Sequence, residues 1–184
     1  MSEPVIINTN EDMLNYAFKQ AQKMGAIRNS IRKGKGNYAG FVGEAAVRQF
    51  FGFPLELNQN TYNFDIIFDN TTYDIKSKQT TVVPKPDYEV SVCDKNTFQD
   101  CSAYLFSRVY WPSHSEDPLK VYLVGWYPKN IYYEKAVFCS KGGRSLSNTN
   151  DFVVKEDCWN MYHKDLLDVR DILSRARSVS QSSL

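Results

Sequence analysis

Asp65–Lys78, with the sequence DIIFDNTTYDIKSK, is the stretch in which acidic and basic side chains recur at a spacing that can build a site. It reads as two short strands, DIIFD and TYDIKSK, that fold back at Asn70-Thr71, because Asn tolerates the left-handed backbone of a tight hairpin turn. The predicted cross-strand pairs are Asp69 with Thr72, Ile67 with Asp74, and Asp65 with Lys76.

The predicted hairpin has one polar face and one apolar face, because residues two apart on a strand share a face. Asp65, Asp74 and Lys76 lie on the polar face, and the apolar face holds Ile66, Phe68, Tyr73 and Ile75. Two carboxylates placed diagonally across a strand pair, roughly 7 Å apart at the backbone, can bind one hard divalent cation through oxygen. Lys76 would then donate to a cation-bound water or to a phosphate oxygen. The geometry alone indicates a cation site.

A known family shows the same arrangement. Asp65, eight intervening residues and then Asp74-Ile75-Lys76, with Glu44 on a predicted helix upstream, resembles the PD-(D/E)XK nuclease superfamily of restriction-type and junction-resolving enzymes. Phe64 stands where the proline of the family name would be. The resemblance spans about residues 38–126, and the small size and the late GWYP and MY…DL segments resemble phage or mobile-element members.

This resemblance implies a metal-dependent phosphodiesterase with a restriction-endonuclease-like core, in which a central mixed β-sheet is flanked by helices. Asp65 and Asp74 would bind Mg²⁺, which Mn²⁺ would replace; Ile75 would lend its carbonyl, and Glu44 would complete the metal shell. Lys76 would orient the water that attacks. The ion would polarise the phosphoryl oxygen and lower the pKa of a bound water. The implied substrate is duplex or branched DNA, cut by an endonuclease that acts as a homodimer if both strands are cut.

Glu44 lies on a predicted helix over residues 38–51, at the border of an apolar face formed by Phe41, Val42, Ala45, Ala46 and Phe50. A single Glu on an amphipathic helix usually faces solvent, so only its place before the hairpin favours a role in the site. Gly40 and Gly43 would let this helix approach the sheet closely.

A basic stretch without acids precedes this helix, and it includes Arg28, Arg32, Lys33 and Lys35. Basic side chains at a nucleic-acid backbone release counterions and supply non-specific affinity, whereas charge runs also occur as solvated turns. Both interpretations stay open. Lys78 shares the predicted polar face with Lys76, and it would hold the scissile phosphate or be a polar edge residue.

The pattern predicts one domain over residues 1–184, with a basic helical arm at 10–37, a core at about 38–126 and an extension at 127–184. A first helix begins at Asn10 or Thr9 as cap and ends near Gly25. Later elements are strands at 88–92, 103–110 and 121–126, short helices at 94–100 and 128–133, an apolar stretch at 136–138, and a last helix at about 164–177.

The composition gives a hydrophobic content of 42% and a net charge of +1, so affinity for a partner must come from local patches rather than from the whole field. The four cysteines form no CxxC pair, and we expect reduced thiols in a cytoplasmic protein, inside a bacterial host if it is phage-encoded. We expect no zinc site and no membrane span.

The sequence offers little support for other catalytic mechanisms, because its two histidines, His114 and His163, accompany no GxSxG or Cys-His signature. Three functions remain: an active DNA endonuclease, a nucleic-acid-binding module that no longer uses its metal, and an unrelated structural or partner-binding protein. If the chain is a nuclease, the sequence does not distinguish a DNA substrate from an RNA substrate, or an exonuclease from an endonuclease.

Overall fold

A five-stranded mixed sheet forms the centre of the structure, a computed structural model that describes residues 3–24, 35–56, 62–146 and 153–181, without the side chains of 35–36 and 177–181. The strand order is β1-β6-β5-β3-β2, and β3 and β5 form the parallel pair. The strands are β1 (Val5–Asn8), β2 (Ile66–Phe68), β3 (Thr71–Thr80), β5 (Ala103–Tyr110) and β6 (Lys120–Pro128).

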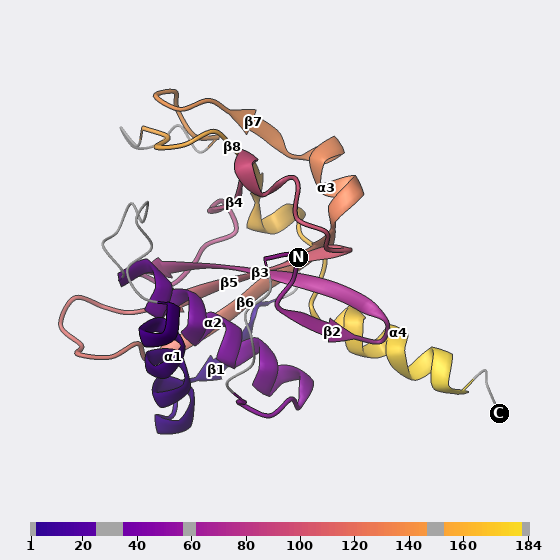
Figure 1. The fold of residues 1–184 in the computed structure, drawn as a ribbon. Helices are drawn as coiled ribbons and strands as arrows, with labels where there is room; N and C mark the ends of the chain where they lie inside the picture. Colours follow the sequence, from indigo (N-terminus) through magenta and orange to yellow (C-terminus); the bar gives the residue numbers. More distant parts are fainter. Residues whose placement is uncertain (1–2, 25–34, 57–61, 147–152, 182–184) are drawn as a thin grey trace.

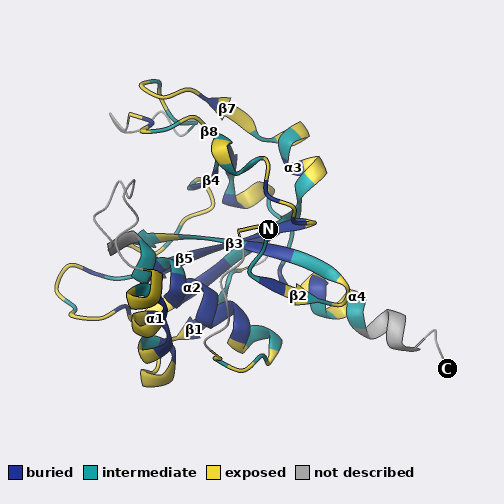
Figure 2. Cartoon of the chain, viewed as in Figure 1, coloured by how far each residue is buried: buried dark blue, intermediate teal, exposed yellow. Residues whose placement is uncertain are grey.

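Helices cover one face of this sheet. Helices α1 (Glu11–Met24) and α2 (Lys35–Phe51) lie below the sheet in Figure 1, and α4 (Arg170–Gln181) lies beside β2. Their apolar side chains form the main hydrophobic core with the strands, and its fully buried members include Met13, Val42 and Leu105. In Figure 2, dark blue marks the buried residues on α2 and on the strands of the central sheet.

A second, smaller sheet covers the other face. Its order is β4-β8-β7, formed by β4 (Glu89–Cys93), β8 (Cys158–Tyr162) and β7 (Val137–Cys139), with α3 (Lys129–Lys135) beside it. Tyr104 and Phe106 of β5 pack against Val92 of β4 and Tyr132 of α3 in a second hydrophobic cluster. The described residues therefore form a single α/β domain in which β5, the central strand of the larger sheet, contributes side chains to both hydrophobic clusters.

The close approach of α2 to the central sheet depends on Gly43. A Cβ atom at this position would lie 2.0 Å from Ser77 Oγ and 2.7 Å from Ser107 Oγ, which are themselves hydrogen-bonded at 2.7 Å. A Cβ at Gly40 would meet nothing within 4 Å. The prediction of a small residue at the helix–sheet contact is thus confirmed for Gly43 and wrong for Gly40.

The helices and central strands largely follow the sequence pattern. Helix α1 is capped by Asn10, whose Oδ1 accepts from Met13 N at 2.9 Å, and β5 has the predicted bounds. Helix α2 begins three residues earlier than expected, and β1 was not predicted. The expected helix at 94–100 is a 3-10 turn over Asp94–Asn96.

Two expectations for the later chain were wrong. The last helix begins at Arg170 rather than near 164, because Leu167 forms an isolated bridge with Trp126 and a 3-10 turn occupies His163–Asp165. The strand predicted at 88–92 was assigned to the core, but it forms over Glu89–Cys93 and pairs with Cys158–Tyr162 in the second sheet. The other face of the central sheet is consequently covered by strands and the short α3.

The hairpin turn lies one residue earlier than predicted. Asp69 and Asn70 have φ of 47° and 57°, the left-handed pair that a two-residue type I′ turn requires. Phe68 therefore pairs with Thr71, Ile67 with Thr72 and Ile66 with Tyr73. Each residue of β2 therefore pairs with a β3 residue two positions earlier than predicted, so the predicted pairing of Asp65 with Lys76 is wrong. Because a shift of two positions keeps every side chain on the same face, the predicted polar and apolar faces of the hairpin are preserved.

Candidate active site

Asp65 lies directly before β2 and is tied to the backbone of β3. Its N–H donates to the carbonyl of Tyr73 at 2.9 Å, and its Oδ2 accepts from Ile75 N at 2.6 Å. Arg48 Nη2 donates to the Asp65 carbonyl at 3.3 Å. These three bonds place the carboxylate beside Tyr73 to Ile75, one step before Lys76.

Asp74 and Lys76 share a face of β3, and their side chains form an ion pair with 2.5 Å between Lys76 Nζ and Asp74 Oδ2. Both side chains are largely buried, at 7% and 16% exposed. Lys76 Nζ also donates to Gln99 Oε1 at 2.8 Å and lies 5.8 Å from the centre of the Tyr104 ring. The ammonium group is therefore held in one position by a carboxylate, an amide and an aromatic face.

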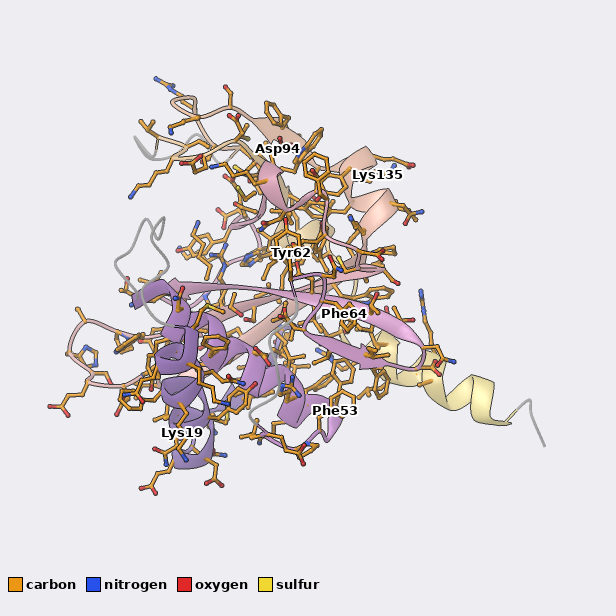
Figure 3. The ribbon with its side chains drawn as sticks, viewed as in Figure 1. Lys19, Phe53, Tyr62, Phe64, Asp94 and Lys135 are labelled. Atoms are coloured by element: carbon orange, nitrogen blue, oxygen red, sulfur yellow. The ribbon has the colours of Figure 1, made fainter. Side chains whose placement is uncertain are left out.

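Gln99 fixes Lys76 from the segment that leads into β5. Its Nε2 donates to the carbonyl of Tyr62 at 2.7 Å, and its own carbonyl accepts from Lys129 Nζ. Tyr62 and Phe64 belong to the segment that leads into β2, and Figure 3 shows both near β3, with Tyr62 above the strand. Gln99 is a residue of the site that the sequence patterns did not indicate, because nothing in the local sequence links it to Lys76.

Glu44 is buried at 8% exposed, rather than at the border of the helix face. Its Oε1 accepts from Tyr16 Oη at 2.7 Å and from Arg48 Nε at 2.9 Å. Burial, followed by the charge of Glu44, raises the pKa of Tyr16 to about 12, so the phenol remains a donor. Arg48 follows Glu44 by four residues, a helical spacing at which opposite charges meet, whereas nothing in the sequence pointed to Tyr16.

Among the carboxylates of the site, Asp65 has a strongly raised pKa. Burial raises its pKa to about 8, and the negative charges of Asp74 and Glu44 act in the same direction. The Ile75 N–H and the charge of Lys76 oppose this shift. Three carboxylates from α2, the start of β2 and β3 thus lie near enough to repel one another, which is the situation that a bound cation relieves.

The donor atoms suit a hard divalent cation, which prefers carboxylate and carbonyl oxygens. The N–H and C=O of one strand residue point to the same side, so the Ile75 carbonyl faces the side on which Asp65 lies. In the described part of the chain, however, no three His, Cys, Asp or Glu side chains are grouped closely enough to hold a metal ion. Lys76 stands at Asp74 Oδ2, the position that a cation would share.

A groove runs from this site along β3. Strand β2 covers only Thr71–Tyr73, so within the described residues the outer edge of β3 beyond Tyr73 has no neighbouring strand. A cavity of about 430 Å³ lies beside this part of β3, between the start of α2 and β4. Its lining includes Ala39, Lys76, Lys78, Ser91 and Arg108. Lys78 is exposed and lines the groove as the continuation of the face that carries Lys76.

Several predicted site residues are not placed. Arg28, Arg32 and Lys33 lie outside the described residues, and so does the side chain of Lys35, although its backbone begins α2. His114 is exposed, and His163 is buried against Arg108. The four cysteines are free thiols.

Comparison of the chain with protein-family models, with curated proteins and with solved structures gives no match. No helix in the described ranges has the length and apolar character required to cross a bilayer. The candidate function therefore depends on the geometry of the site and on the resemblance carried by Asp65, Asp74, Lys76 and Glu44.

Proposed function

We propose that the chain is a metal-dependent nuclease of the PD-(D/E)XK type that hydrolyses phosphodiester bonds in DNA as an endonuclease. The observation that supports this most strongly is the convergence of Asp65, Asp74 and Lys76, with Glu44 buried nearby and Lys76 lining the groove. In this proposal α2, the β2–β3 hairpin, β5 and β6 form the restriction-endonuclease-like core. A homodimer would bring two sites to the two strands of a duplex.

Each residue has a role that its contacts support. Asp65 and Asp74 supply carboxylate oxygens, the Ile75 carbonyl supplies another, and Glu44 adds negative charge from α2. Lys76, held by Gln99, presents its ammonium group to a phosphate oxygen or to the attacking water. Lys78 lies two residues further along the groove, where it neutralises a neighbouring phosphate.

Mg²⁺, or Mn²⁺ in its place, would polarise the phosphoryl oxygen and lower the pKa of a bound water when held by these oxygens. The fit is supported by the pKa of Asp65, which burial raises first and the negative charges of Asp74 and Glu44 raise further, because a bound cation would offset both effects. Binding requires Lys76 to release Asp74 Oδ2, and Gln99 Oε1 is the acceptor that remains for its ammonium group.

A catalytically silent nucleic-acid-binding module is the second candidate, and a specific observation favours it. Two of the three carboxylates accept hydrogen bonds within the protein, Glu44 from Tyr16 and Arg48 and Asp65 from the Ile75 N–H. Asp74 forms an ion pair with Lys76, although its Oδ2 accepts no hydrogen bond within the described residues. A buried charge set that is largely neutralised within the protein can be retained without a metal. Only an activity measurement separates this module from the enzyme.

The deciding experiment is cleavage of labelled linear duplex, single-stranded and four-way branched DNA, and of RNA, with Mg²⁺, Mn²⁺ or a chelator. We expect metal-dependent cleavage by the wild type and a loss of at least a hundredfold in Lys76→Ala, because the ammonium group acts at the reacting phosphate. Lys120→Ala is the matched control, since Lys120 is an exposed lysine of β6 in the same sheet.

The outcomes distinguish the candidates. Retained cleavage in Lys76→Ala would place the chemistry elsewhere. Binding without cleavage of any substrate would favour the silent module, and cleavage confined to RNA would change the substrate while keeping the site.

A further inference from the structure

Three of the four cysteines lie side by side across the second sheet. Cys93 of β4 is the register partner of Cys158 of β8, and Cys158 is also the register partner of Cys139 of β7. Residues that lie directly opposite each other in an antiparallel pair point to the same face, so the three thiols form one row with Cys158 in the middle. No local sequence pattern indicates this row, because the three residues are far apart along the chain.

The row lies on the face of the second sheet that points away from the central sheet. Val92 and Met161, on the opposite face of β4 and β8, belong to the second hydrophobic cluster with the β5 side chains. Cys139 is buried, whereas Cys93 and Cys158 are half-buried. Cys158 also lines a cavity of about 430 Å³ that shares lining residues with the groove. This cavity gives a small reagent access to the middle thiol.

The backbone hydrogen bonds indicate which two thiols can be joined. Asp94 N donates to the Asp157 carbonyl at 2.8 Å, in the register position next to Cys93 and Cys158. Hydrogen-bonded and non-hydrogen-bonded pairs alternate along an antiparallel ladder, so Cys93 and Cys158 form a non-hydrogen-bonded pair. The Cα atoms of such a pair are about 4.5 Å apart, and disulfides have Cα atoms about 4.4–6.8 Å apart.

Cys139 meets the middle thiol in the other kind of pair. The backbone groups of Cys158 point towards β7, since they do not point towards β4, so Cys139 and Cys158 form a hydrogen-bonded pair. Cβ atoms in such a pair are farther apart, towards about 5.5 Å, whereas a disulfide has about 3.5–4.5 Å between them. The Cys158 thiol donates instead to the Cys139 carbonyl, at 3.9 Å. The geometry therefore favours Cys93 as the disulfide partner of Cys158.

We propose that Cys93 and Cys158 are a redox-active pair, which a small-molecule disulfide converts to a cross-strand disulfide. The Cys158 thiolate attacks one sulfur of the reagent to form a mixed disulfide, and the other half of the reagent leaves as a thiolate. The Cys93 thiolate then attacks the Cys158 sulfur and expels the second half. The two cysteine thiols lose two electrons and two protons, and the reagent becomes two thiols. The bond ties β4 to β8, whether or not the chain cleaves nucleic acid.

The first step sets the conditions of the experiment. Burial, followed by the charges of Cys139 and Cys93, raises the pKa of the Cys158 thiol to about 11. Only the thiolate attacks a disulfide, so the reaction is slow at neutral pH. The protein is therefore incubated with oxidised glutathione at mildly alkaline pH until the reaction reaches equilibrium.

The test is digestion of the oxidised protein without reductant, followed by mass spectrometry. We expect the peptides that carry Cys93 and Cys158 to be joined with a loss of two hydrogen atoms, and reductant to separate them. Cys139→Ser is the matched control, and it should keep the bond because its thiol is not used. In Cys93→Ser we expect the glutathione adduct on Cys158 to increase about fivefold or more over the wild type, because the second step lacks its thiol.

A stability measurement on the wild type depends on no substitution. The oxidised protein should unfold at a urea concentration about 1 M or more above that of the reduced protein, because the bond closes a long loop of the unfolded chain. An unchanged unfolding midpoint after full oxidation would overturn the proposal. A bond between Cys139 and Cys158, a glutathione adduct that persists in the wild type, or thiols that stay unmodified in the folded protein would each overturn it as well.

Discussion

At the scale of single residues, Asp65 makes the stability of the metal-free protein depend on pH. Its pKa is raised to about 8 in the folded state, above the 3.8 of a free carboxyl. Between these values the folded state binds a proton that the unfolded state has lost, so the free energy of unfolding falls as pH rises. Asp65→Asn removes this dependence.

We therefore expect urea unfolding with a chelator present to show a smaller loss of stability from pH 5 to pH 9 in Asp65→Asn than in the wild type. Saturating Mg²⁺ is expected to reduce the wild-type loss, because a cation replaces the proton. Identical pH profiles for the two chelated proteins would contradict this account of the carboxylate cluster.

Gln99 gives a second prediction at the residue scale. Gln99→Met keeps the volume but removes the acceptor for Lys76 Nζ and the donor to Tyr62. A hydrogen bond to a charged group contributes about 1.5–3 kcal/mol, so we expect kcat/KM for cleavage to fall by about tenfold or more. The fall should be mainly in kcat, since Lys76 is kept but misplaced.

Gln49→Met serves as the control for Gln99→Met, because Gln49 is exposed on α2. If both variants cleave like the wild type, Lys76 does not need the support of Gln99.

At the scale of elements, the contact between α2 and the central sheet offers a matched pair of glycines. Gly43→Ala places a methyl group 2.0 Å from Ser77 Oγ, and we expect it to reduce the free energy of unfolding by about 1–3 kcal/mol, as overpacking does. Gly40→Ala meets nothing within 4 Å and is expected to raise it by about 0.5–1 kcal/mol. Equilibrium urea unfolding measures both, and equal effects would contradict the proposed contact.

The sequence predicted the elements whose pattern is local. Asn10 capped the first helix as expected, and the aromatic and β-branched run Ala103–Tyr110 formed a strand with the predicted bounds. Asp74 and Lys76 lie on one face because side chains two residues apart on a strand always share a face. All of these features depend only on residues that are close together in the sequence.

The sequence did not predict what depends on distant partners. Glu89–Cys93 joined a second sheet because its partner is Cys158–Tyr162, far away along the chain. Gln99 and Tyr16 reached the site only through tertiary packing, and no local pattern marks either of them. The turn at Asp69-Asn70 was misplaced by one residue, although this error was local, since Asp and Asn adopt positive φ more readily than the β-branched Thr71 does.

At the scale of the whole molecule, the two sheets are joined by a buried polar contact between Arg108 of β5 and His163 beyond β8. Burial, together with the charge of Arg108, lowers the pKa of His163 to about 3. The unfolded state binds a proton near pH 6.5 that the folded state does not, so stability is lost as pH falls from about 6.5 towards 3.

His163→Gln is expected to reduce this acid loss. Between pH 7.5 and pH 5, the free energy of unfolding of the wild type should fall by about 2 kcal/mol more than that of the variant. This figure follows from roughly 1.4 kcal/mol for each pH unit below 6.5. Chemical unfolding at the two pH values measures this difference. Equal losses in the wild type and His163→Gln would show that His163 has the same protonation state in the folded and unfolded proteins.

The parallel pairing of β3 with β5 has a consequence for how the protein folds. Asp74 lies beside Tyr104 in this pair, and the intervening chain contributes β4 to the other sheet and Gln99 to Lys76. Contacts between residues so far apart in the chain form slowly, whereas a two-residue hairpin forms within microseconds. During refolding, the hairpin that carries Asp74 and Lys76 should therefore be complete well before the lysine is anchored, so recovered cleavage would report the closure of the β3–β5 crossover rather than the formation of the strands.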